Sequence, residues 1–360
     1  MLMVIFGAGA SHDSAQAFRI PVPSAAQQSW SPVPTPDDEP WRPPLANDLF
    51  LDRSQQFGKM IFNYPKLSLI LPLLRERVGG QTVEQVLETL LAESEGDPET
   101  KKALASVRFY LCEMLNRVSR EWRSRTSGVT NYAPLLRDIL RFNRSNEPVC
   151  LVTFNYDLLL EQALSTTLEF RDKPPTNQFD SHPIFKLFKL HGSVAWAKVV
   201  DAPSGTRMAP AQLIEAADTL AFRPDEYIRA DATDSAQMFN HGRPIFPAIA
   251  IPVQTKTEDY FECPKSHREY LCELLPSVTK VLIVGWQARE AHFNRILQST
   301  LPALHHVFVV GHDKYDATKI LDYFMGAIGQ SGNTTVTPYM SPGGFTDFIV
   351  DRIGLEFFKA

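Results

Sequence analysis

Short apolar runs that end at a glycine or a polar residue recur along the chain. The first run, Leu2–Phe6, ends at Gly7, and an apolar run of this length is typical of a strand buried on both faces of a sheet. Five later runs are apolar or rich in β-branched residues: Val149–Phe154, Phe185–Leu190, Val281–Val284, Val307–Val310 and Thr334–Tyr339. The pattern therefore predicts about six strands.

Helical patterns lie between most of the strands that follow Asn146. This alternation predicts an α/β fold with a Rossmann-like, mainly parallel sheet of about six strands and helices on both faces. Sheets of this kind bind their ligands at the carboxyl ends of the strands. Polar residues that directly follow a strand are therefore the first candidates for a functional site.

Residues 45–145 differ, because their apolar positions recur at helical spacing. Thr82 and Gln85 make a capping box, and Asp97 before Pro98 is typical of a helix start. One long apolar stripe follows, formed by Leu104, Val107, Leu111, Leu115, Val118 and Trp122. Such a stripe predicts core packing and not a cofactor site, so we interpret this segment as a helical insertion.

The segment between Pro21 and Pro44 holds eight prolines in 24 residues. Proline is unfavourable in a helix or a central strand, so we expect a long extended surface loop over residues 21–44. A loop of this length is either a disordered insertion or a lid, and we favour the disordered insertion.

The composition narrows the class of protein. The chain has 360 residues, 44% hydrophobic and 21% charged, which is the balance of a soluble globular protein. Its net charge of -5 supplies no positive field, so we expect no direct nucleic-acid binding. No run approaches about 20 unbroken apolar residues, so we expect no membrane span. The four cysteines form no Cys-x-x-Cys pair, which is typical of a reduced, cytoplasmic protein without a metal site or disulfide framework.

Gly7-Ala8-Gly9-Ala10-Ser11 directly follows the first predicted strand. The glycines permit a tight turn, and amides at the start of the next helix could then hold a pyrophosphate. The third glycine of the dehydrogenase fingerprint is replaced by His12, and no acidic residue closes a second strand about 20 residues later. A plain strand-to-helix turn remains the alternative.

Two further motifs end predicted strands. In Thr153-Phe154-Asn155-Tyr156-Asp157, the polar side chains are placed either to meet a ligand or to cap the helix that follows. In Leu190-His191-Gly192-Ser193, the histidine stands at the carboxyl end of the next strand. The ordinary pKa of histidine makes it a useful base near neutral pH.

These three motifs, in this order, resemble those of the sirtuin-like (silent information regulator) superfamily of NAD-consuming proteins. The glycine turn matches the family's Gly-Ala-Gly-x-Ser, Thr153–Asp157 matches its Thr-x-Asn-x-Asp, and Leu190–Gly192 contains its His-Gly. Val281–Gly285 looks like the family's apolar strand and glycine beside the adenosine half of NAD. The resemblance implies a single sirtuin-like Rossmann domain over residues 1–360, with the proline-rich loop and the helical insertion inside it.

Several positions depart from the protein-deacylating sirtuins. Val194–Ile249 contains no cysteine, so the zinc module that usually walls the peptide cleft is absent. Arg42–Asp48 replaces the family's Gly-Ile-Pro-x-Phe-Arg, and Phe154 replaces its glutamine. Gly311-His312 stands where a late asparagine often recognises adenosine. These departures resemble the bacterial branch whose members hydrolyse NAD during defence against bacteriophages.

The resemblance therefore implies an NAD glycohydrolase that uses NAD as its substrate and needs no metal. Asn155 would hold the ribose and the attacking water, His191 would act as base, and Asp157 would orient the nicotinamide carboxamide. The NAD-binding residues that the resemblance implies are Gly7, Ala8, Gly9, Ala10, Ser11, Thr153, Gly285 and Trp286. A protein deacylase and a sensor that binds NAD or ADP-ribose without turnover are the alternatives. Because uncontrolled loss of NAD is toxic, we expect control by homo-oligomerisation or by a partner protein of a defence system.

Overall fold

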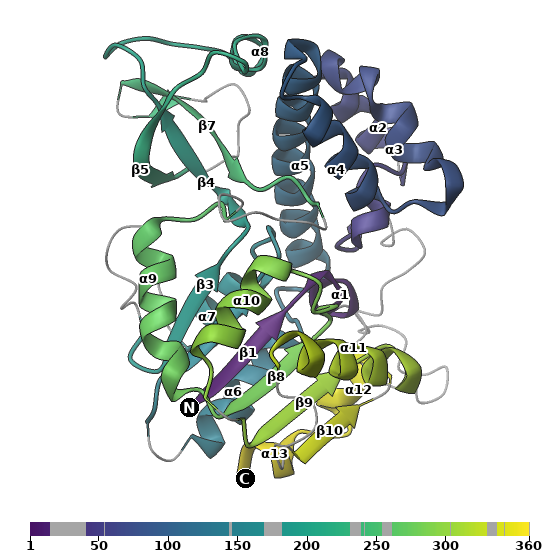
Figure 1. The fold of residues 1–360 in the computed structure, drawn as a ribbon, viewed down its shortest axis with the longest axis vertical. Coiled ribbons are helices and arrows are strands. Elements are labelled where there is room, and N and C mark those ends of the chain that lie inside the picture. The colour runs from purple at the N-terminus through teal and green to yellow at the C-terminus, as the bar shows by residue number, and fades with distance from the viewer. Residues whose placement is uncertain are drawn as a thin grey trace.

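The computed structural model describes residues 1–14, 41–53, 55–143, 146–168, 182–230, 239–240, 242–253, 261–302, 304–329, 337–341 and 343–359 (Figure 1). Most of the proline-rich loop predicted at 21–44 lies outside these described residues. In the described part of the chain, no helix is long and apolar enough to cross a membrane.

Six parallel strands form the main sheet, in the order β10-β9-β8-β1-β2-β3. They are β1 (Leu2–Phe6), β2 (Val149–Thr153), β3 (Phe185–Lys189), β8 (Lys280–Val284), β9 (His306–Val310) and β10 (Thr337–Ser341). Each coincides with or overlaps one of the predicted apolar runs, and the predicted fold class is confirmed. The largest shift concerns the last strand, which was predicted at Thr334–Tyr339 but covers Thr337–Ser341.

Helices cover both faces of this sheet. Because side chains alternate along a strand, Val4 and Phe6 of β1 face one apolar cluster, while Met3 and Ile5 face another. The first face is covered by α6 (Tyr132–Phe142), α7 (Leu159–Leu168), α12 (Gly344–Val350) and α13 (Leu355–Lys359). The second is covered by α9 (Lys265–Leu274), α10 (Ala291–Thr300) and α11 (Lys314–Ala327). The result is a three-layer α/β/α core.

The inserted segment is helical, as its periodicity predicts. It contains η4 (Ala46–Asp48), α2 (Gln55–Phe62), η5 (Pro65–Leu69), α3 (Leu71–Glu76), η6 (Val78–Gly80), α4 (Val83–Glu93) and α5 (Pro98–Arg125). The predicted capping box is present, since the backbone N–H of Gln85 donates to the Thr82 hydroxyl and the Thr82 N–H donates to the Gln85 side chain. Asp97 caps the 28-residue helix α5.

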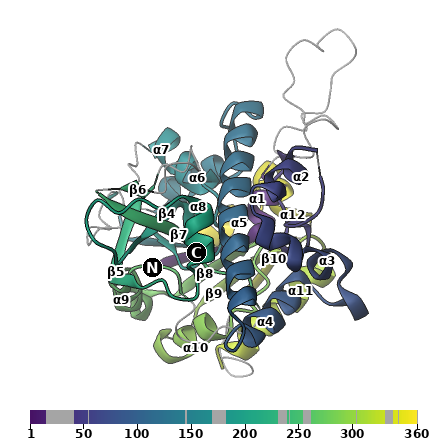
Figure 2. The ribbon, with the colours of Figure 1, turned by 90° about the horizontal axis from the view of Figure 1, so that it is seen from above.

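A second sheet, which the sequence analysis did not predict, begins directly after His191. It is antiparallel, in the order β5-β4-β7-β6, and consists of β4 (Gly192–Val200), β5 (Phe222–Arg229), β6 (Phe239–Asn240) and β7 (Arg243–Ile249), with α8 (Pro210–Glu215) beside it. Helix α5 stands between this sheet and the α2–α4 helices, as Figures 1 and 2 both show. The small α1 (Ala8–Asp13) and η8 (Leu275–Ser277) complete the described elements.

Candidate functional site

The order of the strands places a crevice between β1 and β8. From β1 the chain moves outward through β2 to β3, whereas β8, β9 and β10 extend in the other direction. Ligands of doubly wound sheets bind where the order reverses in this way, at the carboxyl ends of the strands. A cavity of about 910 Å³ lies there, and five strand ends contribute to its lining through Gly7, Asn155, His191, Gly285 and Gly311.

The glycine turn after β1 packs against the turn after β8. The N–H of Gly9 donates to the carbonyl of Gly285 at 3.1 Å, and a Cβ atom at Gly9 would lie 2.9 Å from the Gly285 Cα. Gly285 itself has a φ of +62°, and its Cβ would lie 2.2 Å from the Ala10 nitrogen. The close approach of two backbones is therefore a sufficient reason for these glycines.

Several groups of the turn are already engaged. Three of its amides donate to backbone carbonyls: Gly7 to Val284, Gly9 to Gly285 and Ala10 to Gly7. Gly7, Ala8, Gly9 and Ser11 line the cavity, whereas Ala10 is buried in the core and does not. The turn thus faces the cavity, but only part of its hydrogen-bonding capacity remains for a ligand.

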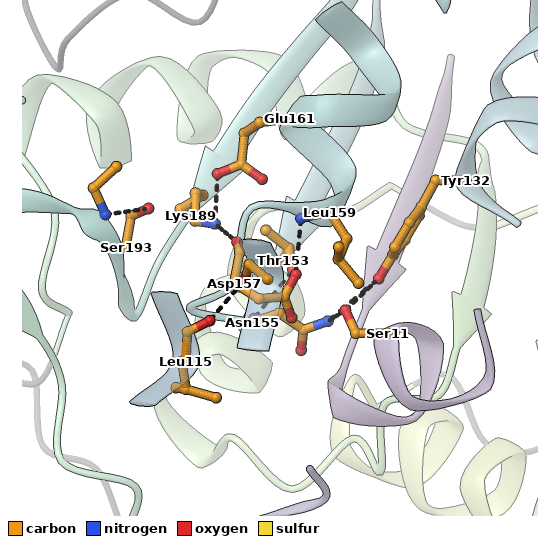
Figure 3. Close-up of polar contacts among 12 residues, drawn as sticks. Ser11, Leu115, Tyr132, Thr153, Asn155, Asp157, Leu159, Glu161, Lys189 and Ser193 are labelled. Carbon is orange, nitrogen blue, oxygen red and sulfur yellow. Dashed lines mark hydrogen bonds and ion pairs between the residues drawn. The ribbon is translucent and has the colours of Figure 1, made fainter. Parts of the chain in front are cut away.

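Asn155 lies at the centre of the polar contacts in Figure 3. Its side-chain nitrogen donates to the carbonyl of Gly7 at 2.9 Å and to the hydroxyl of Ser11 at 3.0 Å. A carbonyl can only accept, so the contact with Gly7 fixes which end of the amide is the nitrogen. The side-chain oxygen of Asn155 has no partner within the described ranges, and the residue lines the cavity. This oxygen can accept a hydrogen bond from a ligand or a water.

Tyr132, at the start of α6, is a part of this network that the sequence analysis missed. Its hydroxyl lies 2.8 Å from the Ser11 hydroxyl and 3.4 Å from the Asn155 nitrogen. The ring packs edge-on against Phe6 and Phe345. Burial raises the pKa of the Tyr132 phenol well above its ordinary value, so the hydroxyl stays protonated. Tyr132 therefore joins the first strand's turn to the motif that follows β2.

Thr153 and Asp157 have structural partners. The hydroxyl of Thr153 accepts the Asn155 backbone N–H at 3.1 Å, and Thr153 does not line the cavity. One carboxylate oxygen of Asp157 accepts the Leu159 N–H at 3.0 Å, which is the helix-cap role. Asp157 nevertheless lines the cavity. Asp157 therefore both caps the helix and lines the cavity.

A buried ion pair lies behind this motif and was also missed. The Lys189 ammonium, at the end of β3, donates to the Glu161 carboxylate at 2.6 Å and to the Asp157 carbonyl at 2.5 Å (Figure 3). Lys189 and Glu161 are both almost fully buried. The contacts hold the loop that carries Asn155 and Asp157 against β3. The available sequence signal was a lysine that ends an apolar strand, with a glutamate in the preceding helix.

His191 is 4% exposed and lies in an aromatic part of the cavity. Its ring centroid is 4.7 Å from that of Phe154 and 6.3 Å from that of Tyr156. Phe154 in turn stacks on Trp286, with centroids 5.3 Å apart, and the indole N–H of Trp286 donates to the Glu290 carboxylate. The predicted residues His191 and Trp286 are thus brought together through Phe154.

The inserted segment supplies a second set of lining residues. It includes Arg42–Leu49, Thr82 and Glu84 around the start of α4, and Leu115 of α5. Residues 42–48 had drawn notice only as a departure from a sirtuin motif, and nothing local in the sequence marked Glu84 as a site residue. In the described part of the chain, no group of three or more His, Cys, Asp or Glu side chains could hold a metal ion.

Comparison with known proteins identifies the domain. The model of the SIR2-like domain family matches residues 149–319, a range that includes Asn155, Asp157, His191 and Trp286. Among solved structures, a Sir2 homologue described as an NAD complex is 12% identical, with 98% of this chain and 88% of that chain covered, at a TM-score of 0.38. A likeness this loose carries no detail of the site across. No curated protein matches. Residues 149–319 of this chain therefore match the SIR2-like domain family.

Proposed function

We propose that this protein is an NAD glycohydrolase that converts NAD⁺ and water to nicotinamide, ADP-ribose and a proton. The observation that carries the proposal is the convergence of Asn155 and His191, from the ends of two adjacent parallel strands, on one large cavity beside the glycine turn. Its volume of about 910 Å³ is at the upper end of the range for pockets that bury small molecules. The match to the SIR2-like domain family supports NAD as the ligand.

The reaction requires little general acid catalysis from the protein. The bond between ribose C1′ and the pyridinium nitrogen breaks, its electron pair goes to that nitrogen, and nicotinamide leaves as a neutral molecule. Water forms the new bond to C1′ and loses a proton, for which His191 is the proposed base. The remaining task is to position the water and to stabilise the positive charge that develops on the ribose.

The contacts of the other residues support particular roles. The free side-chain oxygen of Asn155 is available to accept from a ribose hydroxyl or from the attacking water. Asp157 uses one carboxylate oxygen to cap α7, so the proposed contact with the nicotinamide carboxamide falls to the other oxygen. The amides of Gly7, Gly9 and Ala10 already donate to backbone carbonyls, so the proposed phosphate contacts of Gly7–Ser11 are made by its other groups. Gly285 and Trp286 remain proposed NAD contacts, since both line the cavity.

The decisive experiment is incubation of purified protein with NAD⁺, followed by identification of the products. Nicotinamide and ADP-ribose in equal amounts are expected, with no change on addition of a metal chelator. A cyclic product, or acyl transfer from an acylated peptide to ADP-ribose, would replace hydrolysis with a different reaction. Binding of NAD⁺ measured by calorimetry, with no product at any protein concentration, would favour the sensor alternative.

We also propose a biological setting, an NAD-depleting effector of bacterial defence against bacteriophages that acts in the cytoplasm. The Phe-Asn-Tyr-Asp form of the motif at residues 154–157 supports this branch. Control by homo-oligomerisation or by a partner protein belongs to the same proposal. In infected cells that express the protein, cellular NAD should fall, and it should not fall with His191→Ala. If cellular NAD stays unchanged in infected cells although the purified enzyme is active, the protein hydrolyses NAD but does not act as an effector of this defence.

A further inference from the structure

Glu84 is a carboxylate of the cavity that the mechanism above does not use. It stands in the first turn of α4, lines the cavity and is partly buried. In the part of the chain that the structure describes, its side chain has no hydrogen-bond or ion-pair partner. A partly desolvated carboxylate without a partner is costly unless a cation or a donor approaches it.

The backbone around Glu84 is firmly placed. The neighbouring Val83 and Leu87 are fully buried, and the Val83 N–H donates to the Asn47 side-chain oxygen at 3.1 Å. The capping box of Thr82 and Gln85 closes the first turn of the helix. The carboxylate is therefore presented to the cavity by a fixed helix start and not by a loose loop.

Most other carboxylates that line the cavity are already engaged. Asp157 accepts from Leu159, Glu290 from Trp286, Asp13 from Thr346, and Asp316 from Gln287 and His312. Only Asp48 and Glu84 have no hydrogen-bond or ion-pair partner for their side chains among the described residues of the lining. Of these two, Asp48 lies in the three-residue η4, whereas Glu84 is held by the capped start of the 11-residue α4.

Glu84 lines the same cavity as Asn155 and His191. Burial, and then the negative charge of Glu84, raise the pKa of the phenol of Tyr156, the residue between Asn155 and Asp157, whose ring lies beside that of His191. The open carboxylate and the proposed catalytic residues therefore share one cavity.

We propose that Glu84 is a specificity-determining residue that selects the positively charged nicotinamide ring of NAD⁺ over the uncharged ring of NADH. This inference rests on the proposed function, because it takes NAD⁺ as the ligand. The nicotinamide ring is the cationic part of NAD⁺, and the proposed mechanism places it beside Asn155, Asp157 and His191, in the cavity that Glu84 also lines. ADP-ribose lacks the ring altogether, so it should be indifferent to the charge at position 84.

The test is a set of calorimetric titrations with NAD⁺, NADH and ADP-ribose. All proteins carry His191→Ala, so that NAD⁺ stays intact, and Glu84→Gln is compared with the unchanged background. Glu88→Gln is the matched control. Glu88 lies one turn after Glu84 in α4 and carries the same charge, but it does not line the cavity. Glu84→Gln should weaken NAD⁺ binding about two- to fivefold, as expected of a partly solvated ion pair, and leave NADH and ADP-ribose unchanged. Glu88→Gln should change none of the three.

The ratio of NAD⁺ to NADH affinity is the deciding readout, because a general disturbance of α4 would lower both affinities together. An unchanged ratio in a folded Glu84→Gln protein, or an equal loss for all three ligands, overturns the inference while the proposed function stands. Failure of the proposed function is recognised separately. In that case the parent protein cleaves no NAD⁺, whether or not the background variant binds the three ligands.

Discussion

Two regions line the cavity. Their polar side chains differ in whether they already have hydrogen-bond or ion-pair partners within the protein. The residues that follow the strands bond to one another, as Asn155 does to Gly7 and Ser11. The inserted helical segment presents Asp48 and Glu84 without hydrogen-bond or ion-pair partners within the described ranges. Preorganised groups can do chemistry without rearrangement, whereas an open charge is suited to choosing a ligand. Under the proposed function, the strand ends carry out the reaction and the helices select the ligand.

The largest expected effect is loss of catalysis from changes at the strand ends. His191→Ala should lower NAD⁺ cleavage about 100- to 10,000-fold, the usual cost of removing a general base. Asn155→Ala should also greatly reduce turnover, because it removes the ribose and water contact. Steady-state product formation, with folding checked by circular dichroism, measures both. Near-normal turnover in folded His191→Ala protein would remove this residue from the mechanism and break the comparison.

The next effect concerns the ion pair behind the Asn155 loop. Lys189→Met removes the ammonium that pairs with the buried Glu161 carboxylate and should cost about 3–5 kcal/mol of stability. The double variant Lys189→Met with Glu161→Leu should recover most of that loss, because no charge is then left buried. Chemical denaturation of the parent and both variants supplies the measurement. Equal stability of the single and double variants would show that charge pairing is not what holds this loop.

Glycine substitutions test whether the turn serves packing or the ligand. Gly285→Ala should destabilise the fold by about 1–3 kcal/mol, because its φ of +62° and the nearby Ala10 backbone both oppose a side chain. Gly9→Ala meets a less severe contact and should cost less. Thermal melts and NAD⁺ titrations of both variants separate the two effects. A destabilised but folded Gly9→Ala protein that binds NAD⁺ normally would mean that Gly9 serves packing alone.

The smallest effect lies at the link between the strand ends and α6. Tyr132→Phe removes the hydroxyl that contacts Ser11 and should lower kcat about two- to tenfold with little change in KM, as one hydrogen bond contributes about 0.5–1.5 kcal/mol. Tyr64→Phe is the control, since its hydroxyl bonds Glu113 outside the cavity. This control should lower stability without lowering kcat. If both variants leave kcat unchanged, Tyr132 does not position Asn155.

The main sheet was predictable because strands buried on both faces read as continuous apolar runs, and all six runs overlap observed strands. The antiparallel sheet was not predictable from the sequence. Its strand β5, Phe222–Arg229, is half-exposed and carries four charged residues besides a proline, while β7 contains Pro244 and Pro247. Such segments satisfy no simple strand pattern, because their pairing depends on neighbours supplied by the rest of the fold.

By itself, the sequence determined the six buried strands, the helical character of the insertion and the polar motifs at the strand ends, since each depends on residues close together in the chain. Only the tertiary structure decided which distant residues share the cavity. Tyr132 reaches Ser11 across 121 positions, and Glu84 lines the same cavity as Asn155 although no sequence motif marks it as a site residue. Local pattern carries information about burial and period, whereas such contacts arise from how whole elements pack.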